Sequence, residues 1–208
     1  MSKANTVVVL DFETTGLSPA YGDRAIEIGA VRIEDGEIKD RFQELMNPGR
    51  PVDSFIESYT GITNDMLKDA RPCKQVMGEF AEFIGDYNLV AHNASFDKRF
   101  LDAEFRRVSK TYTGKFSCSM LLARRLYQDA SNHKLATLVR YANIPSDGGF
   151  HRALYDSEMT AKLWLSMLGH INTHYGLSSI PFTLTQKLTK MQKQQVSKFL
   201  NRQANDSP

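Results

Sequence analysis

Two carboxylic acids, Asp11 and Glu13, stand two residues apart at the end of a run of aliphatic residues. The run, Val7 to Leu10, predicts a strand that is buried on both faces near the middle of a sheet. Because side chains alternate along a strand, Asp11 and Glu13 share the face of Val7 and Val9. Adjacent carboxylates repel each other and resist removal from water, and a divalent cation would relieve both costs. The alternative is a strand that runs out into solvent and ends in polar residues.

Two further acids, Asp97 and Asp156, occupy inward-facing positions of predicted helices. On a helical wheel Asp97 falls within the apolar arc of its helix, and Asp156 shares a stripe with Leu163. An inward carboxylate is costly unless a cation or hydrogen bonds compensate it. For Asp97 the alternative is a favourable interaction with the helix dipole in the first turn. One shared metal site would explain these two acids together with the first pair.

His151 precedes Asp156 by five residues and follows Gly148 and Gly149. Five residues along a helix would turn the histidine about 140° away from Asp156. We therefore place His151 on a flexible loop before the helix, where it is either a solvated histidine or, beside a metal site, a general base. The remaining histidines have no comparable context, and we expect no catalytic role for them: His92, His133, His170 and His174.

The order of strand and helix patterns indicates the fold class. Three strands come first, with a hairpin turn signal at Asp35-Gly36, and helices interleaved with short strands follow. The expected strands are 7–12, 24–33, 38–46 and 89–91, and the expected helices are 73–85, 95–108, 116–127, 135–141 and 154–168. This order is typical of an α/β domain with a mixed sheet.

Composition changes after Gly169. With 208 residues, 41% of them hydrophobic, the chain has material for one core and a small appendage. We divide it into a domain at 1–176 and a linker with an amphipathic helical tail at 177–208, whose apolar positions have helical spacing. The tail holds five basic residues and one acid, Asp206, which leaves about −2 on the first 176 residues. Attraction to polyanions must therefore come from local patches and from the tail.

The chain has no apolar stretch long enough to cross a membrane and no signal-peptide pattern at its N-terminus. Its two cysteines, Cys73 and Cys118, show neither metal spacing nor a disulfide framework. These features favour a reduced, cytoplasmic setting.

Three motifs in order resemble those of the DEDDh 3′–5′ exonucleases, the DnaQ-like family that includes the proofreading epsilon subunit of bacterial replicative polymerase and ribonuclease T. The motifs are Asp11-Phe12-Glu13-Thr14-Thr15-Gly16-Leu17, His92-Asn93-Ala94-Ser95-Phe96-Asp97 and His151-Arg152-Ala153-Leu154-Tyr155-Asp156. The resemblance covers roughly residues 6–170, and the histidine five residues before the last aspartate indicates the histidine branch. Within the third motif, Arg152 and Tyr155 look like variable positions.

The resemblance implies a ribonuclease H-like fold, with a mixed five-stranded sheet flanked by helices and a basic helical C-terminal extension. It also implies two Mg²⁺ or Mn²⁺ ions. Asp11 would bridge both ions, Glu13 and Asp156 would complete the first site, and Asp97 would serve the second. His151 would take a proton from the water that attacks the terminal phosphodiester, so that nucleoside 5′-monophosphates leave the 3′ end.

The implied substrate is the 3′ end of single-stranded nucleic acid, with DNA favoured over RNA. Thr14, Thr15 and Gly16 would contact the terminal 3′-OH, and Leu17 and Phe96 would flank the last base, for which the alternative is ordinary core packing. Asn93 is a further candidate for substrate binding. The favoured alternative is that Asn93 caps the following helix.

Two other functions remain open. Asp11 to Thr15 resembles a phosphatase nucleophile motif, from which Glu13 departs. The fold could instead serve as a binding subunit whose tail docks a DNA polymerase or a sliding clamp, since 195–199 faintly resembles a clamp-binding peptide. An RNA-trimming exoribonuclease is the remaining variant of the enzyme hypothesis.

Overall fold

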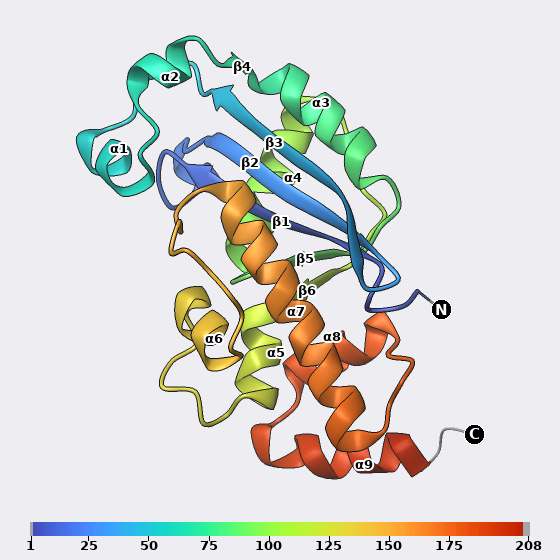
Figure 1. Cartoon of the computed structure of the whole chain (residues 1–208). Helices are drawn as coiled ribbons and strands as arrows, with labels where there is room; N and C mark the ends of the chain where they lie inside the picture. The colour runs from blue at the N-terminus through green and yellow to red at the C-terminus, as the bar shows by residue number, and fades with distance from the viewer. Residues whose placement is uncertain (1, 206–208) are drawn as a thin grey trace.

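A mixed sheet forms the centre of the computed structural model, which describes residues 2–205 (Figure 1). The strand order is β4-β3-β2-β1-β5-β6, so β1 lies inside the sheet as predicted. β1 is antiparallel to β2 and parallel to β5, whereas β2 and β3 form the expected hairpin. The strands are β1 (Val7–Thr14), β2 (Ala25–Glu34), β3 (Glu37–Asn47), β4 (Arg71–Pro72), β5 (Leu89–Ala91) and β6 (Phe116–Cys118). The two-residue β4 adds a sixth strand to the five that we expected.

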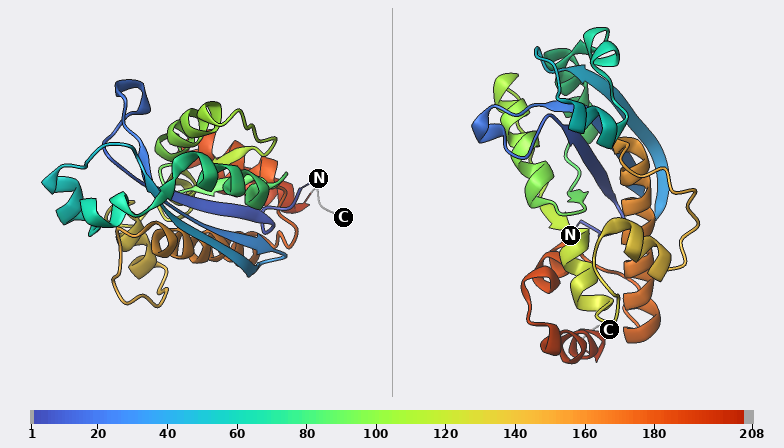
Figure 2. Two further views of the ribbon diagram at one scale, coloured as in Figure 1. Left: turned by 90° about the horizontal axis from the view of Figure 1, so that it is seen from above. Right: turned by 90° about the vertical axis from the view of Figure 1, so that its left-hand side faces the viewer.

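Helices cover both faces of this sheet. The helices are α1 (Ser54–Thr60), α2 (Asn64–Lys68), α3 (Cys73–Ile84), α4 (Ser95–Arg107), α5 (Ser119–Leu126), α6 (Leu135–Tyr141), α7 (Ala153–Tyr175), α8 (Phe182–Lys190) and α9 (Val196–Asn205), with 3-10 turns at Pro19–Tyr21 and Lys193–Gln195. α3 and α4 pack on one face, over Val8 and Leu10. α7 crosses the other face, over Val7 and Val9, and α5 packs beside it (Figure 2). No helix within residues 2–205 has the length and apolarity that a membrane span requires.

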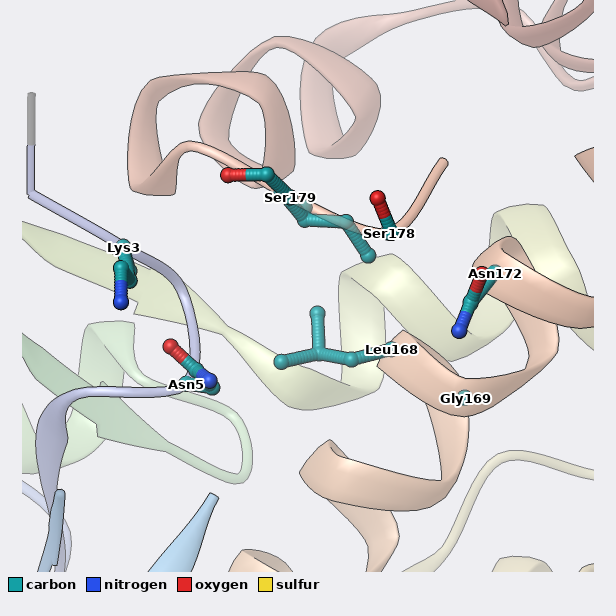
Figure 3. Close-up of a pocket in the computed structure, with 8 residues that line it drawn as sticks. Lys3, Asn5, Leu168, Gly169, Asn172, Ser178 and Ser179 are labelled. Atoms are coloured by element: carbon teal, nitrogen blue, oxygen red, sulfur yellow. The ribbon is translucent and has the colours of Figure 1, made fainter. Parts of the chain in front are cut away.

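The C-terminal segment is anchored to the N-terminus and to α7. The backbone N–H of Ala4 donates to the carbonyl of Ile180 at 2.8 Å, and that of Phe182 donates to Ser2 at 2.9 Å. Trp164 of α7 donates its indole N–H to the carbonyl of Ala4 at 2.7 Å. A small cavity of about 280 Å³ remains where these three segments meet, with side chains from the N-terminal segment, α7 and the connector around it (Figure 3). The basic extension is therefore part of the folded body.

Three segments differ from the sequence-based expectation. The predicted helix at 116–127 begins with strand β6, because its first three residues pair in parallel with β5. The single tail helix is two helices, since the backbone is extended at Met191 between α8 and the following 3-10 turn. Helices α1 and α2 were not expected, although Asp53 and Thr63 cap them by accepting hydrogen bonds from Ile56 and Met66. Asp206, the acid that we noted in the tail, lies outside the described residues.

Candidate active site

The four predicted acids lie where β1, α4 and α7 meet. Asp11 and Glu13 are half-buried at the carboxyl end of β1. Asp97 lies in the first turn of α4 and is 1% exposed, and Asp156 lies in the first turn of α7 and is 7% exposed. Both helices therefore present their first-turn acid inward, as the helical periodicity predicted.

These carboxylates are close together. One oxygen from each of Asp11, Glu13 and Asp156 lies within 4.8 Å of the other two. Asp97 joins the group through the backbone of β1, because its Oδ1 accepts a hydrogen bond from the N–H of Phe12 at 3.2 Å. The acids of β1 face a cluster of other acids, so the alternative of a strand that ends in open solvent is wrong.

The cluster is electrostatically unfavourable without a cation. Burial, followed by the charges of Asp156, Glu27 and Asp97, raises the pKa of Glu13 to about 8. Burial likewise raises the pKa of Asp97 to about 7 and the pKa of Asp156 to about 6. The pKa of Asp11 is raised well above its usual value by burial and by the neighbouring carboxylates. At neutral pH these groups cannot all ionise unless positive charge compensates them.

The donor set fits a hard divalent cation. Within the described residues, Oδ1 of Asp156 is buried and has no hydrogen-bond partner. The arginine of the third motif, Arg152, is paired with Glu27, and its charge offsets only part of the burial and repulsion that raise the pKa of Glu13. Carboxylate oxygens are the ligands that Mg²⁺ and Mn²⁺ prefer. An unpartnered buried oxygen beside two further carboxylates is what a metal ligand set presents before the ion binds.

His151 lies on the loop before α7, as predicted, and its imidazole borders the acids. Its backbone adopts a left-handed conformation with φ of 74°, which is uncommon for a residue with a side chain. The backbone N–H of His151 donates to Oδ2 of Asp156 at 2.9 Å, which fixes the loop to the cluster. The imidazole packs against the ring of Tyr59, with 4.2 Å between ring centroids. The side chain is exposed and therefore accessible to a substrate.

An ion pair between a buried glutamate and a partly exposed arginine positions the start of α7. Glu27 of β2 is fully buried and accepts hydrogen bonds from the guanidinium of Arg152 at 2.8 Å and from the N–H of Ala153 at 3.0 Å. Tyr155 accepts a hydrogen bond from the N–H of Gly148 at 3.2 Å. Arg152 and Tyr155, for which we expected no particular role, both hold the segment that carries His151 and Asp156.

Gly29 lets α7 lie directly on the sheet. In the β1–β2 register Gly29 is the partner of Asp11. A Cβ atom at this position would lie 2.1 Å from backbone atoms of Ala153 and Leu154. The missing side chain is thus what allows the first turn of α7, and Asp156 with it, to approach β1.

The turn after β1 is held by its own side chains. Thr14 donates its hydroxyl hydrogen to the carbonyl of Gly16 at 2.6 Å. The hydroxyl of Thr15 donates to Asp23 at 3.3 Å and accepts from the N–H of Arg24 at 3.1 Å. Both hydroxyls are already occupied, and Thr15 does not line the cavity beside the acids. Geometry therefore gives no support to a substrate contact by Thr15.

Two adjoining cavities open on the carboxylates. One, of about 530 Å³, contains most of the predicted substrate-binding residues: Thr14, Gly16, Leu17, Asn93 and Phe96. The other, of about 890 Å³, extends toward α5 and α6. Both are bordered by Asp11, Tyr59, His151 and Asp156. The acids thus lie at the junction of two open cavities.

Apolar and aromatic side chains make up much of the exposed wall of the smaller cavity. Leu17 is 79% exposed, which is a poor position for core packing. Phe96 contacts Phe100 with 5.0 Å between ring centroids, so it packs partly on the core. Asn93 has a φ of 69° and its side chain does not cap α4, where the N-cap residue is Ala94. The expected capping role of Asn93 was wrong, and its exposed side chain borders both cavities.

The chain matches a known protein family over most of its length. The model of the RNase T family, described as exonuclease, matches residues 8–164. The chain belongs to this exonuclease family. Its motif residues are those of the DEDDh, DnaQ-like type, as the resemblance indicated.

The relatives of the exonuclease include much longer proteins. The DNA polymerase III PolC-type of Bacillus subtilis (strain 168) is 46% identical over 165 residues, which is 78% of this chain and 11% of that protein. The chain therefore spans about a tenth of the length of such relatives. A solved structure of exonuclease X in complex with 5′ overhanging duplex DNA has a TM-score of 0.69 and 29% identity, and covers 88% of this chain and 99% of that one. The nuclease domain of 3′hExo, a DEDDh family member bound to rAMP, has a TM-score of 0.68 at 23% identity, covers 79% of this chain and 92% of that one, and supports the fold.

Several residues that border the carboxylates or position them were not found from the sequence. Phe55 and Tyr59 of α1 stack on each other with 5.8 Å between ring centroids, and are 69% and 51% exposed. Both line the smaller cavity. Two sequence signals could have revealed more of the site: a glycine at position 29 within an apolar strand, and an acid, Glu27, between apolar residues of that strand.

Proposed function

We propose that this chain is a metal-dependent 3′–5′ exonuclease that releases nucleoside 5′-monophosphates from single-stranded DNA. The observation that carries the proposal is the cluster of Asp11, Glu13 and Asp156 oxygens within 4.8 Å, bordered by an accessible histidine. Membership of an exonuclease family narrows the reaction to phosphodiester hydrolysis at a strand end. The direction, the strand preference and the number of ions are parts of the proposal.

The carboxylates would hold two divalent cations, Mg²⁺ or Mn²⁺. Asp11, Glu13 and Asp156 supply the first set of oxygens, and Asp97 supplies the second site together with Asp11. When bound, such ions supply Lewis-acid stabilisation of the attacking and leaving oxygens. The protein holds the ligands in place through the Glu27–Arg152 pair and the close contact at Gly29.

His151 is the proposed general base. Its loop is fixed to Asp156 through the backbone N–H, and its imidazole is free to accept a proton from the attacking water. Contact with Tyr59 restricts the imidazole on one side, which favours an orientation toward the cavities. The left-handed backbone at this position is the kind of strained geometry that functional sites retain.

The smaller cavity is the proposed site of the 3′-terminal nucleoside. Leu17 and Phe96 would flank the base, and the stacked Phe55 and Tyr59 offer a further apolar wall. Such contacts accept any base, because each base has an apolar face. Thr14, Gly16 and Asn93 line the same cavity and would contact the sugar. The hydroxyl of Thr14 is engaged with Gly16, so its contribution would come from the backbone.

DNA is the preferred substrate in this proposal. The support is the similarity to PolC-type DNA polymerases and to exonuclease X, whose structure contains DNA. This relationship also supports a role beside a DNA polymerase in proofreading, replication or repair, with the C-terminal extension as one docking segment. RNA trimming is the second candidate, because a related structure concerns a 3′-exonuclease on histone mRNA.

We further propose 1–176 as the catalytic domain, 177–208 as its extension, and a cytoplasmic location suited to two free cysteines.

Two rival functions are less favoured. A phosphatase would not need the complete set of motif acids and the histidine, and the family model that matches is that of an exonuclease. A purely non-catalytic binding subunit is disfavoured because all five motif residues are present and four of them converge.

The test uses matched 5′-labelled DNA and RNA strands with Mg²⁺, each with a free or a blocked 3′ end. We expect stepwise shortening from the free 3′ end, mononucleotide 5′-phosphates as products, faster digestion of DNA, and no activity in excess chelator. Asp11→Ala and His151→Ala should abolish or strongly reduce the rate. Full activity of either variant, or shortening from a blocked 3′ end, would refute the proposal.

A further inference from the structure

The larger of the two cavities differs from the smaller one in charge. It extends from Asp11 and His151 to Arg124, Asn132 and Lys134, at the end of α5 and the start of α6. Beyond the shared acids and His151, the smaller cavity is lined by Glu13 and by apolar and neutral polar groups, with no lysine or arginine among the described residues that line it. One side of the catalytic cluster therefore offers apolar surface, and the other side offers lysine and arginine.

The basic side chains on this side are available. Within residues 2–205, Arg124, Lys134 and Lys193 form no salt bridge and no side-chain hydrogen bond. On the opposite side of the domain, arginines such as Arg24 and Arg71 are paired with glutamates. Unpaired cations that border a catalytic cavity are poised to bind an anionic ligand.

The loop that carries Lys134 is fixed in place. His92 contacts the hydroxyl of Ser119 at 2.8 Å through Nδ1 and the carbonyl of His133 at 3.0 Å through Nε2. Burial lowers the pKa of His92 to about 4, so this histidine is neutral and acts as a structural link. Its ring ties the second motif to the loop before α6.

The C-terminal extension adds to the same surface. Arg125 donates to the carbonyl of Met191 at 3.0 Å, and Gln128 donates to the carbonyl of Lys193 at 3.3 Å. These bonds hold the 3-10 turn at Lys193–Gln195 against the end of α5. Burial, and after it the charges of Arg124 and Lys193, lower the pKa of His133, which agrees with the hydrogen bonds that hold residue 193 near this loop.

We propose that Arg124, Lys134 and Lys193 form a basic track that binds the sugar-phosphate backbone of the substrate strand on the 5′ side of the cleaved bond. The strand would place its terminal nucleoside in the smaller cavity and cross the carboxylates. It would then continue over the loop before α6 to the C-terminal extension. Lys193 lies outside residues 8–164, the part that the exonuclease family shares. The extension would thus lengthen the strand-binding surface of this particular chain.

This inference rests on the proposed function, and its test separates the two. We would measure kcat/KM for Arg124→Ala, Lys134→Ala and Lys193→Ala on p-nitrophenyl thymidine 5′-monophosphate, which has no upstream phosphate, and on DNA strands of increasing length. We expect unchanged rates on the small ester and a loss of roughly two- to fivefold per variant on long strands, as for exposed charge pairs. The loss for Arg124→Ala should appear on shorter strands than the loss for Lys193→Ala.

Binding in chelator provides a readout that does not need cleavage. We would follow a fluorescent DNA strand by anisotropy at several salt concentrations, where each lost phosphate contact should lower the slope of log K against log salt by about 0.7. Lys74→Ala on α3 and Arg106→Ala at the end of α4 are charge-matched controls among exposed residues away from the cavity.

Each outcome decides one claim. The basic track would be overturned if the variants bind and cleave long strands like the wild type. It would also be overturned if their loss of affinity and rate is no larger than that of the two controls. Equal losses on the small ester would also overturn it, because the residues would then act on the catalytic cluster. If the wild-type protein cleaves neither substrate, the proposed function fails, and the salt dependence of binding still tests the track.

Discussion

Gly29→Ala is the sharpest perturbation of the geometry that brings β1 and α7 together. The added Cβ atom would lie 2.1 Å from the backbone of Ala153 and Leu154, whereas ordinary contacts begin near 3.4 Å. The first turn of α7 must therefore move by roughly 1 Å or more, and a displacement of this size at a catalytic group costs about 100-fold in rate. The strain should also destabilise the fold by about 1–3 kcal/mol, as overpacking does elsewhere.

The assay combines kcat on a labelled DNA strand with the urea-unfolding midpoint. Gly169→Ala is the matched control, because this glycine lies in the same helix and an added Cβ atom would meet nothing within 4 Å. The control should keep wild-type activity and gain about 0.5–1 kcal/mol from better helix propensity. Gly29→Ala protein with wild-type turnover and stability would refute the claim that this contact positions Asp156.

Further predictions concern the electrostatics and the walls of the site. Because the pKa values of Glu13 and Asp156 are raised to about 8 and about 6, the folded state binds more protons than the unfolded chain between about pH 4 and pH 8. Metal-free protein should therefore lose stability as pH rises through this window. The increase in Tm on adding Mg²⁺ should grow with pH. An increase in Tm that is the same at pH 5 and pH 8 would contradict this expectation. Arg152→Ala should lower the free energy of unfolding by about 2 kcal/mol, because Glu27 loses its charged partner, whereas Arg41→Ala, which breaks an exposed pair, should cost less than about 1 kcal/mol in the same urea titration. Tyr59→Ala should reduce kcat/KM on DNA by roughly tenfold or more through lost stacking, and Tyr59→Phe should remain near the wild-type value; equal effects of the two substitutions would exclude stacking as the cause.

Periodicity and spacing were sufficient to predict the acids of the site. Alternation along β1 assigned Asp11 and Glu13 to one face, and helical phase assigned Asp97 and Asp156 to inward positions. These rules work because burial acts on whole faces of an element, and a polar residue on an apolar face is conspicuous. The distances between these elements could not be predicted, because a local sequence pattern carries no information about them.

The parts that could not be predicted depend on tertiary contacts. β6 has three residues and is followed at once by α5, so it is too short to show alternation and reads as the start of the helix. The pairing of Glu27 with Arg152 joins residues that are 125 positions apart, and only the packing of α7 on β2 brings them together. Tyr59 was missed for the same reason, since its role depends on contact with a loop near position 151.

If the four motif carboxylates form a cation site, isothermal titration of the metal-free protein with Mn²⁺ at pH 7 should show it. We expect saturable binding that releases protons, because the pKa values of the ligands are raised, and a strong loss of affinity in Asp156→Asn and Asp11→Asn variants that remain folded. Binding to both variants with the wild-type affinity and proton release would contradict it.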